Sequence, residues 1–547
     1  MQDKEFNLLD EGWIKVLAPD LSVKEVSLVD ALINAHNYRS LSGEMPTQDF
    51  AVLRLLLACM QTIFYRYDAQ GKPSEIDGWW DKEDILARWK EFWDKGSFSE
   101  EAVTDYFKQY HERFWLFHPE TPFYQVPDLK YGTDYGVQSL YGNIKSSNHK
   151  TTKYHFSMYE GEFVQNTGFP EAARWLLHLN GFGVNVKNKE EAPGTTNPAG
   201  VGRLGRLGLI FSDGKNLFEL IMLNLTPLNP ANEAWENPNP VWEQKVRTLQ
   251  SIEIAPPGNL PELYTLQSRR IMLVRNGGTV SGFRALNGDY YPVEDDFNEQ
   301  MTIWRRNEDK KTHKITYIPQ KHSPEIQAWR EFPVIFDTAD TGHVPGVVSW
   351  INTLCENSSA LDGRLLTFNT VGIIYGDKSY TFGDCLSDGI TLSAGILKKF
   401  SREWIKLITD EIDKCSIVAE KAIRNFAKKI AAVFNGDGKT REKYLKEKFY
   451  SQIDAPFRGW AASIQPDICS KETIIEEWEE AAYGYARNVI SEYVSGIELY
   501  VGRMKETENR IVSIPGAYNE YLMEIRSIYP KIKKTGRKEN MEDEHKS

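Results

Sequence analysis

One uninterrupted stretch of 39 residues decides the fold: Ile396–Phe434, with the sequence ILKKFSREWIKLITDEIDKCSIVAEKAIRNFAKKIAAVF. It contains no glycine and no proline, the two residues least compatible with a helix interior. Its apolar residues recur at intervals of three and four, as at Trp404, Ile408 and Ile412, which is the periodicity of one helical face. The spacing predicts an amphipathic helix roughly 60 Å long, which ends at the turn Asn435-Gly-Asp-Gly438.

Three further helical patterns follow this stretch along the chain. They cover Thr440–Ile464, interrupted at Pro456, then Lys471–Leu499, and then Thr507–Ile528, interrupted at Pro515. Helices joined by short turns pack as antiparallel neighbours, so we expect an antiparallel four-helix bundle over residues 393–530. The remainder, 531–547, is charged and poor in apolar residues and is predicted to be a disordered tail.

The first 392 residues show a different pattern, in which short apolar segments alternate with turns and helical stretches. Ile271–Val274 and Thr279–Leu286 flank a tight turn at Arg275–Gly278, which predicts a β-hairpin. A second tight turn, Tyr375–Lys378, lies between two further strand-like segments. A chain of 547 residues is also too long for one core. We therefore expect an α+β protein with a large mixed α/β domain at 1–392, followed by the bundle.

The charge of the chain is unevenly divided. The net charge is −12, but residues 393–547 hold 27 Lys and Arg against 25 Asp and Glu, so the acidic excess lies in 1–392. An acidic total argues against a free-standing, non-specific DNA binder, yet it allows a local contact to nucleic acid. Five cysteines without a CxxC pair favour a reducing compartment. We expect a cytoplasmic protein with no signal peptide and no membrane segment.

Residues 197–208, NPAGVGRLGRLG, hold four glycines and two arginines. Gly200, Gly202 and Gly205 have the spacing of the dinucleotide-binding fingerprint G-x-G-x-x-G. That fingerprint follows a strand and opens a helix, whereas here a loop precedes the glycines and a strand-like segment follows them. The sequence therefore predicts no nicotinamide or flavin site, and no other cofactor. It favours a loop that lies close to a nucleic acid or a phosphate, because glycine permits close approach and arginine binds phosphate.

Motifs of catalysis are missing from the sequence, which has no HExxH, GxSxG or P-loop. Glu294–Asp296 could hold a metal ion, but such a charge run is more typical of a solvated loop. His178, in an apolar helix, is more typical of a core histidine than of a ligand. We therefore expect no enzyme activity and no metal. Two alternatives stay open: a carbohydrate-active enzyme, suggested by 15 tryptophans and an acidic charge, and a metal-dependent nuclease.

A polar loop, Ser146–His155, combines Lys150 and Lys153 with Tyr154. Single-stranded nucleic acid is bound by basic side chains that neutralise its backbone and by rings that stack on its bases. The composition of this loop therefore suits a nucleic-acid contact. An ordinary solvated loop is the alternative that the residues alone leave open.

Several stretches together resemble the CasA family, the large subunit of the type I-E CRISPR surveillance complex, Cascade. They are Phe6–Val16, Arg54–Leu57, Phe117–Gln125, Glu171–Leu177 and the terminal bundle. Each stretch is only moderately specific, but all of them occur in the family's order from residue 6 to about residue 530. The resemblance thus covers nearly the whole chain.

The resemblance implies a non-catalytic protein of antiviral defence. In this family the large domain reads the protospacer-adjacent motif (PAM) of duplex DNA, mainly from the minor groove, and promotes the strand separation that lets the guide RNA pair. The bundle helps hold the displaced strand, and the subunit docks a separate helicase–nuclease effector. The expected partners are the other Cascade subunits, the CRISPR guide RNA, target double-stranded DNA and the effector.

The resemblance also assigns roles to residues of this chain. They are Asn148, Lys150, Lys153 and Tyr154 for the guide RNA and neighbouring subunits; Pro198, Ala199, Gly200, Val201, Gly202 and Arg203 in the glycine loop for the duplex; Tyr375, Gly376, Asp377 and Lys378 in a wedge hairpin; Arg284 as the nearest substitute for a lysine that enters the minor groove; and Lys398, Lys399, Arg402 and Lys406 on the first bundle helix for the displaced strand.

Two of these sites lead to specific hypotheses. In the glycine loop, Gly200 and Gly202 would allow the duplex to approach closely while Arg203 contacts a phosphate. On this hypothesis Gly202→Val blocks duplex capture and leaves complex assembly intact. At the wedge, relatives can carry a glutamine at the tip, where this chain has Asp377 or Lys378.

Overall fold

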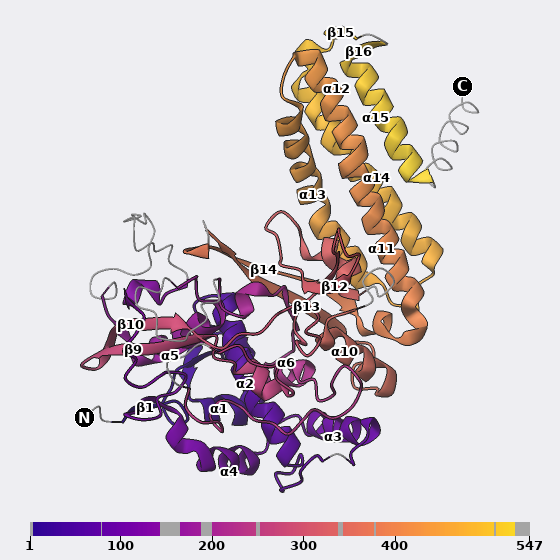
Figure 1. Ribbon diagram of the computed structural model, residues 1–547. Helices are drawn as coiled ribbons and strands as arrows, with labels where there is room; N and C mark the ends of the chain where they lie inside the picture. The colour runs from indigo at the N-terminus through magenta and orange to yellow at the C-terminus, as the bar shows by residue number, and fades with distance from the viewer. Residues whose placement is uncertain are drawn as a thin grey trace. The chain divides into compact units, whose positions relative to one another are not determined.

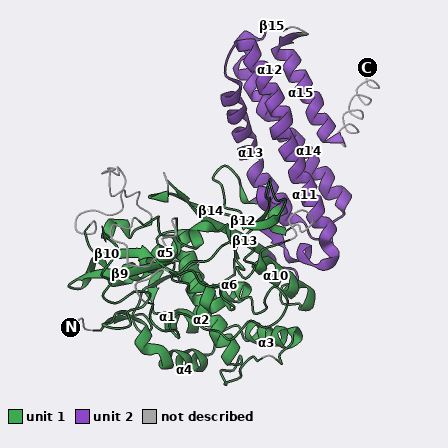
Figure 2. Ribbon diagram, in the orientation of Figure 1, with its two compact units in different colours: residues 1–328, 334–361, 366–389 green, residues 329–333, 362–365, 390–547 purple. Residues whose placement is uncertain are grey.

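The structure is a computed structural model that describes residues 4–77, 79–142, 165–186, 200–247, 252–336, 343–376, 379–507 and 510–530. Helices and strands are mixed along the chain (Figure 1). The chain divides into two compact units (Figure 2): unit 1 comprises 1–328, 334–361 and 366–389, and unit 2 comprises 329–333, 362–365 and 390–547. Within the described ranges, no helix combines the length and the apolarity needed to cross a membrane. The predicted tail at 531–547 lies outside these ranges.

The elements before residue 394 alternate between helices and short strands. The helices are α1 (Leu28–Ile33), α2 (Pro46–Arg66), α3 (Lys82–Lys95), α4 (Glu100–Tyr110), α5 (Phe169–Phe182), α6 (Leu217–Asn224), α7 (Leu260–Tyr264), α8 (Phe332–Phe336) and α10 (Gly346–Asn357). The strands are β1 (Glu5–Asn7), β2 (Ile14–Leu17), β3 (Val23–Val26), β4 (Ser40–Leu41), β5 (Trp115–Phe117), β6 (Thr133–Gly136), β7 (Thr167–Gly168), β8 (Leu209–Ser212), β9 (Arg269–Asn276), β10 (Thr279–Asn287), β11 (Trp304–Glu308), β12 (Ile315–Pro319), β13 (Leu365–Tyr375) and β14 (Phe382–Ser393).

Two sheets carry the predicted hairpins. In the first sheet, β10 pairs antiparallel with β9, β6 and β7. The turn between β9 and β10 contains Gly277 at a φ of +57°, a left-handed conformation that glycine adopts without strain. In the second sheet the order is β14-β13-β8, and β13 and β14 flank the turn predicted after Tyr375. Both hairpin predictions are therefore confirmed.

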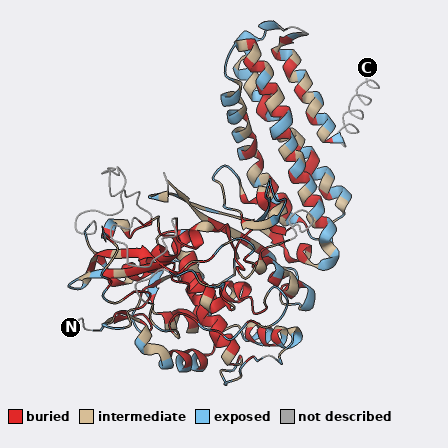
Figure 3. Ribbon diagram, viewed as in Figure 1, coloured by how far each residue is buried: buried red, intermediate tan, exposed pale blue. Residues whose placement is uncertain are grey.

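The core of unit 1 is built around α2, whose residues are buried on nearly every side (Figure 3). The helix begins with Pro46, whose fixed φ suits a first turn, and it packs against α5, α6 and α7. Arg54 is buried within it, and its guanidinium pairs with Glu299, with Nη2 and Oε2 3.0 Å apart. The same guanidinium lies 3.8 Å from the ring centre of Tyr264. The buried charge is thus neutralised by an ion pair and a ring.

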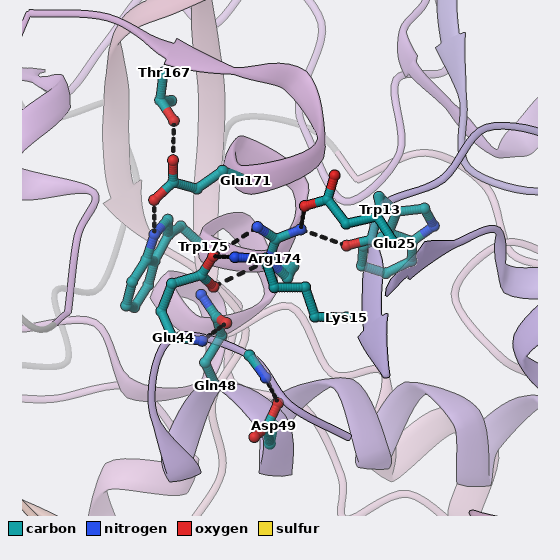
Figure 4. A network of polar contacts seen from close by, with 11 residues as sticks. Trp13, Lys15, Glu25, Glu44, Gln48, Asp49, Thr167, Glu171, Arg174 and Trp175 are labelled. Atoms are coloured by element: carbon teal, nitrogen blue, oxygen red, sulfur yellow. Dashed lines mark hydrogen bonds and ion pairs between the residues drawn. The ribbon is translucent and has the colours of Figure 1, made fainter. Parts of the chain in front are cut away.

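Helix α5 is fixed to the N-terminal strands by a buried polar network around Arg174 (Figure 4). Arg174 donates to the carbonyl oxygen of Trp13 at 2.6 Å, to Glu25 at 2.8 Å and to Glu44 at 2.6 Å. These bonds tie the middle of α5 to the N-terminal segments, and the helix ends at Phe182, beside the candidate site described below. A buried arginine with two carboxylate partners is a stable arrangement only while all three charges are present.

His178, also on α5, is a core histidine, as the sequence predicted. Its ring is fully buried, its Nε2 lies 3.2 Å from the hydroxyl of Thr47, and it packs between the rings of Trp175 and Phe182. Burial lowers its pKa to about 3. The ring is therefore neutral and packs as an apolar group at neutral pH.

Unit 2 is mainly helical. Its elements are α11 (Arg402–Ile417), a π-helical segment (Val418–Ile423), α12 (Arg424–Phe434), α13 (Gly438–Ser463), α14 (Lys471–Gly496), the hairpin of β15 (Met504–Thr507) and β16 (Arg510–Ser513), and α15 (Ile514–Ile528). α12 and α14 each pack against both α13 and α15. The buried residues lie on the facing sides of these helices (Figure 3). Among them, the stacked rings of Trp460 and Trp478 have centroids 5.0 Å apart.

Three helix boundaries in unit 2 differ from those predicted. The first long helix begins at Arg402 rather than Ile396, because Lys398 has an extended backbone (ψ 146°) and Lys399–Ser401 form a 3-10 turn. Pro456 does not interrupt α13, because the buried residues on either side of it keep the helix packed despite the lost hydrogen bond. Met504–Thr507 and Arg510–Ser513 pair as antiparallel strands, and Pro515 lies in the first turn of α15, a position that proline favours.

Candidate nucleic-acid interface

The glycine loop is described from Gly200 onward, so Pro198 and Ala199 lie outside the described residues. Gly200 has a φ of +132°, a conformation that L-residues rarely adopt. Leu204–Arg206 form a 3-10 turn that leads into β8. The loop predicted from the sequence is therefore present, and a strand follows it, as expected.

Three glycines of the loop leave space that other atoms of the protein occupy. A Cβ on Gly202 would overlap the carbonyl oxygen of Gly181 and lie 2.7 Å from its carbonyl carbon. A Cβ on Gly205 would overlap the hydroxyl of Tyr375, and one on Gly208 would overlap the carbonyl oxygen of Gln320. Gly202 therefore makes room for the end of α5, and its role in the approach of DNA stays a prediction.

Arg203 is occupied inside the protein. Its side chain is 7% exposed and forms an ion pair with Asp296. Its Nη2 also donates to the hydroxyl of Tyr291 at 2.8 Å, and the guanidinium lies 4.0 Å from the centre of that ring. Because Arg203 is buried and already paired with Asp296, its geometry does not support the hypothesis that it contacts a phosphate. The expectation of a solvated acidic run at Glu294–Asp296 is wrong for Asp296, which is buried.

The hairpin between β13 and β14 closes with two backbone hydrogen bonds. The amide of Gly376 donates to the carbonyl of Thr381 at 2.9 Å, and the amide of Ser379 donates to the carbonyl of Gly376 at 3.0 Å. Tyr375 donates its hydroxyl to the carbonyl of Phe182 at 2.7 Å, so that group faces α5. Burial raises the pKa of Tyr375 far above its ordinary value. Asp377 and Lys378, at the predicted tip, lie outside the described residues.

The glycine loop and this hairpin are brought together by Asn185. Its side-chain Oδ1 accepts a hydrogen bond from the backbone amide of Gly200 at 3.2 Å. Its backbone amide donates to the carbonyl oxygen of Ser379 at 2.8 Å. The two predicted DNA-contacting elements, which are about 175 residues apart in sequence, therefore share one support.

Arg284 is engaged on the sheet surface. Its Nε and Nη2 bind both carboxylate oxygens of Asp134 at 2.7 and 2.9 Å, and its Nη1 donates to the carbonyl of Leu129 at 3.0 Å. A carboxylate beside the guanidinium repels phosphate and competes for its donors. The assignment of Arg284 to a minor groove is therefore not supported by its geometry.

The bundle cations differ in their surroundings. Lys398 pairs with Asp362 at 2.8 Å. Lys399, Arg402 and Lys406 are exposed, and the spacing of four residues places Arg402 and Lys406 on one face of α11. Lys398 and Lys399 precede this helix rather than lying on it. Of the guide-RNA residues, Asn148, Lys150, Lys153 and Tyr154 lie outside the described residues.

Two functional candidates escaped the sequence analysis. Phe400, which lies within the predicted amphipathic stretch, is 96% exposed between Lys399 and Arg402. Arg269 is buried and bonds to the backbone of the glycine loop. The available clue for Arg269 was a pair of arginines, Arg269 and Arg270, at the start of an apolar strand. No group of three or more metal-binding side chains occurs within the described ranges.

Comparison with known proteins identifies the family. The sequence profile described as CRISPR-associated protein Cse1 matches residues 7–489. This chain therefore belongs to the Cse1 family of CRISPR-associated proteins. A curated relative, CRISPR-associated protein CasA/Cse1 of Thermus thermophilus, is 26% identical over 507 residues, which cover 88% of this chain and 91% of that protein.

Solved structures share the fold. Cse1 of Thermobifida fusca aligns with a TM-score of 0.80 at 24% identity, covering 97% of this chain and 99% of its own. Cse1 from Acidimicrobium ferrooxidans aligns with a TM-score of 0.76 at 23% identity, covering 97% and 100%. A chain of a CRISPR RNA-guided surveillance complex aligns with a TM-score of 0.71 at 17% identity, covering 96% and 100%. The mixed helix-and-sheet prediction is confirmed by these likenesses.

Proposed function

We propose that this chain is the large, non-catalytic subunit of an RNA-guided surveillance complex. It reads a short motif in duplex DNA, promotes the separation of the strands so that the guide RNA can pair, and docks a helicase–nuclease effector. In this division of labour, base pairing supplies most of the specificity and the protein reads only a short flank. The partners are the other subunits, the guide RNA, the DNA and the effector, and the site of action is the cytoplasm. Membership of the Cse1 family supports the proposal.

The observation that carries this proposal is the shared support of the glycine loop and the hairpin through Asn185. A loop that reads the motif and a hairpin that parts the strands must act on adjacent base pairs, so they must be held close together. Arg203 and Arg284 already pair with carboxylates and Val201–Gly205 are buried, so contact with the duplex is assigned to the partly exposed backbone at Gly200. Backbone contacts in the minor groove distinguish little beyond A·T from G·C, so we expect several motifs to be accepted.

The helices of unit 2 form a four-helix bundle that holds the displaced strand, with residues 1–392 and 393–530 as the two domains. Lys399, Arg402 and Lys406 supply exposed positive charge at the start of the first bundle helix. Phe400 supplies a ring that is 96% exposed between two of them. Exposed rings among cations bind single strands by stacking on bases while the cations neutralise phosphates.

Reconstitution tests the proposed function. The complex is assembled on a guide RNA with and without this chain, and its affinity is measured for target duplexes with a preferred or a scrambled flanking motif. We expect the motif to affect affinity only when this chain is present. Equal affinity for both duplexes would contradict the proposal. Incubation of the purified chain with Mg²⁺ and DNA, or with a glycan panel, separates the enzyme alternatives, because this proposal predicts no turnover.

A further inference from the structure

Arg269, at the first position of β9, is buried with 3% of its surface exposed, and no carboxylate among the described residues forms an ion pair with it. Two other buried arginines of unit 1, Arg203 and Arg270, pair with carboxylates. A buried charge without a countercharge is costly unless its hydrogen-bonding groups are well satisfied. Burial, followed by the nearby charge of Arg206, lowers the pKa of Arg269 to about 10. Such a residue needs another physical reason for its position.

The guanidinium of Arg269 binds backbone carbonyl oxygens from two segments. Its Nη2 lies 2.9 Å from the oxygen of Gly183 and 3.2 Å from that of Val184, both just after α5. The same nitrogen lies 2.9 Å from the oxygen of Gly200 in the glycine loop. The amide of Gly202 also donates to the oxygen of Gly183 at 2.8 Å. Arg269 therefore joins the glycine loop to the end of α5.

The end of α5 also holds the hairpin. We define Phe182–Asn185 as the support segment. The carbonyl of Phe182 accepts from the hydroxyl of Tyr375 at 2.7 Å, and the amide of Asn185 donates to Ser379 at 2.8 Å. The support segment thus contacts the hairpin through its first and last residues and Arg269 through the two residues between them.

We propose that Arg269 is a positioning residue for duplex recognition: it fixes the glycine loop on the support segment and so sets the loop's position relative to the hairpin. The proposal rests on the proposed function of these two elements. The planar guanidinium of Arg269 uses two nitrogens: Nη2 contacts the carbonyls of both segments, while Nη1 donates to the carbonyl of Ser268 at 2.9 Å and so fixes the plane of the group. A lysine keeps the charge but has no such planar fork. Motif reading and strand opening are therefore coupled through Arg269.

The experiment compares R269M, R269K and the wild type within the reconstituted complex. Each is measured on a closed duplex with the preferred motif, on one with a scrambled motif, and on a duplex already unpaired next to the motif. We expect R269M to lose about tenfold or more in affinity for the preferred closed duplex, the scale of one charge-assisted hydrogen bond. Binding to the pre-opened duplex stays within about twofold, since that substrate bypasses strand opening. R269K recovers only part of the loss.

The control is R275M, which removes an arginine from the far end of the same strand, where it pairs with Glu5. A merely structural role for Arg269 predicts equal losses on closed and pre-opened duplexes, and that result would overturn the proposal. Should R269M fail to assemble, R269K and Y375F decide the question on the same three duplexes. Y375F removes the bond to Phe182, so its effect and that of R269K must be non-additive in a double-mutant cycle. Additive effects would also refute the coupling.

The two proposals fail in different ways. A wild-type complex that does not distinguish the preferred motif from the scrambled one contradicts the proposed function itself. A wild-type complex that does distinguish them, together with an R269M complex that distinguishes them equally well, contradicts only the role of Arg269.

Discussion

The hydroxyl of Tyr375 occupies the space that a Cβ on Gly205 would fill. This is a direct contact between the glycine loop and the hairpin, in addition to their shared support. The absence of one carbon atom at position 205 therefore allows Tyr375 to reach the carbonyl of Phe182.

Gly205→Ala should push Tyr375 away from Phe182 and displace the hairpin. We expect a loss of about 1–3 kcal/mol in the free energy of unfolding, the usual cost of overpacking, together with weaker discrimination between preferred and scrambled motifs. Urea unfolding and duplex binding measure the two effects. Gly136→Ala is the matched control, because nothing lies within 4 Å of a Cβ at that position. A stable, fully discriminating G205A would show that the hairpin does not depend on this contact.

Gly202→Val should damage folding before it affects DNA binding. The added side chain would collide with the backbone of Gly181, which cannot move aside as a flexible side chain could. We expect a lower Tm for the isolated chain and poorer assembly into the complex. Size-exclusion chromatography and a thermal melt check this outcome. An assembled complex with a wild-type Tm and no duplex binding would instead support the hypothesis that Gly202 gives the DNA room to approach.

Neutralising Lys399, Arg402 and Lys406 with glutamine should weaken the hold on the displaced strand without altering motif discrimination. The logarithm of the affinity falls linearly with the logarithm of the salt concentration, and each contact to a single-strand phosphate makes this slope steeper by about 0.7. Each contact that the substitutions remove should therefore make the slope shallower by that amount. We therefore expect a shallower salt dependence and greater nuclease sensitivity of the displaced strand. K443Q, on an exposed lysine of α13, serves as the control. Unchanged slopes for the triple variant would place the strand elsewhere.

Glu44 should contribute stability that is lost in acid. Burial alone would raise the pKa of Glu44, but the hydrogen bonds and charges of Arg174 and Lys15 lower it to about 2. Such a carboxyl stabilises the fold above its unfolded pKa, and this contribution disappears as the pH falls through the folded value. We expect E44Q to lose on the order of 3 kcal/mol at neutral pH. It should also show a smaller drop in stability between about pH 5 and pH 2, measured by urea titration.

Asp49 provides the contrast for this measurement. Its carboxylate accepts from the amide of Gly43 at 2.7 Å, and burial raises its pKa to about 7. The sign is opposite, because a raised carboxyl pKa favours the folded state at low pH and the benefit is lost as the pH rises from about 4 through 7. D49N should therefore change how the free energy of unfolding varies with pH between about pH 4 and pH 7, whereas E44Q changes it between about pH 5 and pH 2. Identical windows would mean that the two pKa shifts are misassigned.

Local patterns made much of the fold predictable. The β9–β10 turn is marked by Gly277 and Gly278, and α3 by the capping residue Asp81 and by Gly96. These features depend on neighbours along the chain. The break at Lys398 was missed because the side-chain periodicity continues through it, whereas the backbone conformation does not.

The candidate site was less predictable, because its chemistry depends on residues far apart in sequence. Arg203 is paired with Asp296, 93 positions away, and no local pattern indicates that its charge is already neutralised. Gly202 is the residue type expected in a ligand-binding loop, but its neighbour in space is Gly181 of the same chain. The positions of the loop and the hairpin in the chain could be predicted. The partners of their side chains could not.

The π-helical segment Val418–Ile423 has a consequence for the two halves of the first long helix. From Val418 to Phe434 the buried positions recur mainly at every fourth residue, and this spacing drifts about 40° per step around an ideal α-helix. A π-helical turn holds more residues than an α-helical turn, so each residue rotates less about the helix axis. This smaller rotation cancels part of the drift of the buried face. Removing one residue there would turn α11 about 100° relative to α12. The segment therefore acts as a phase correction that keeps both halves facing one core.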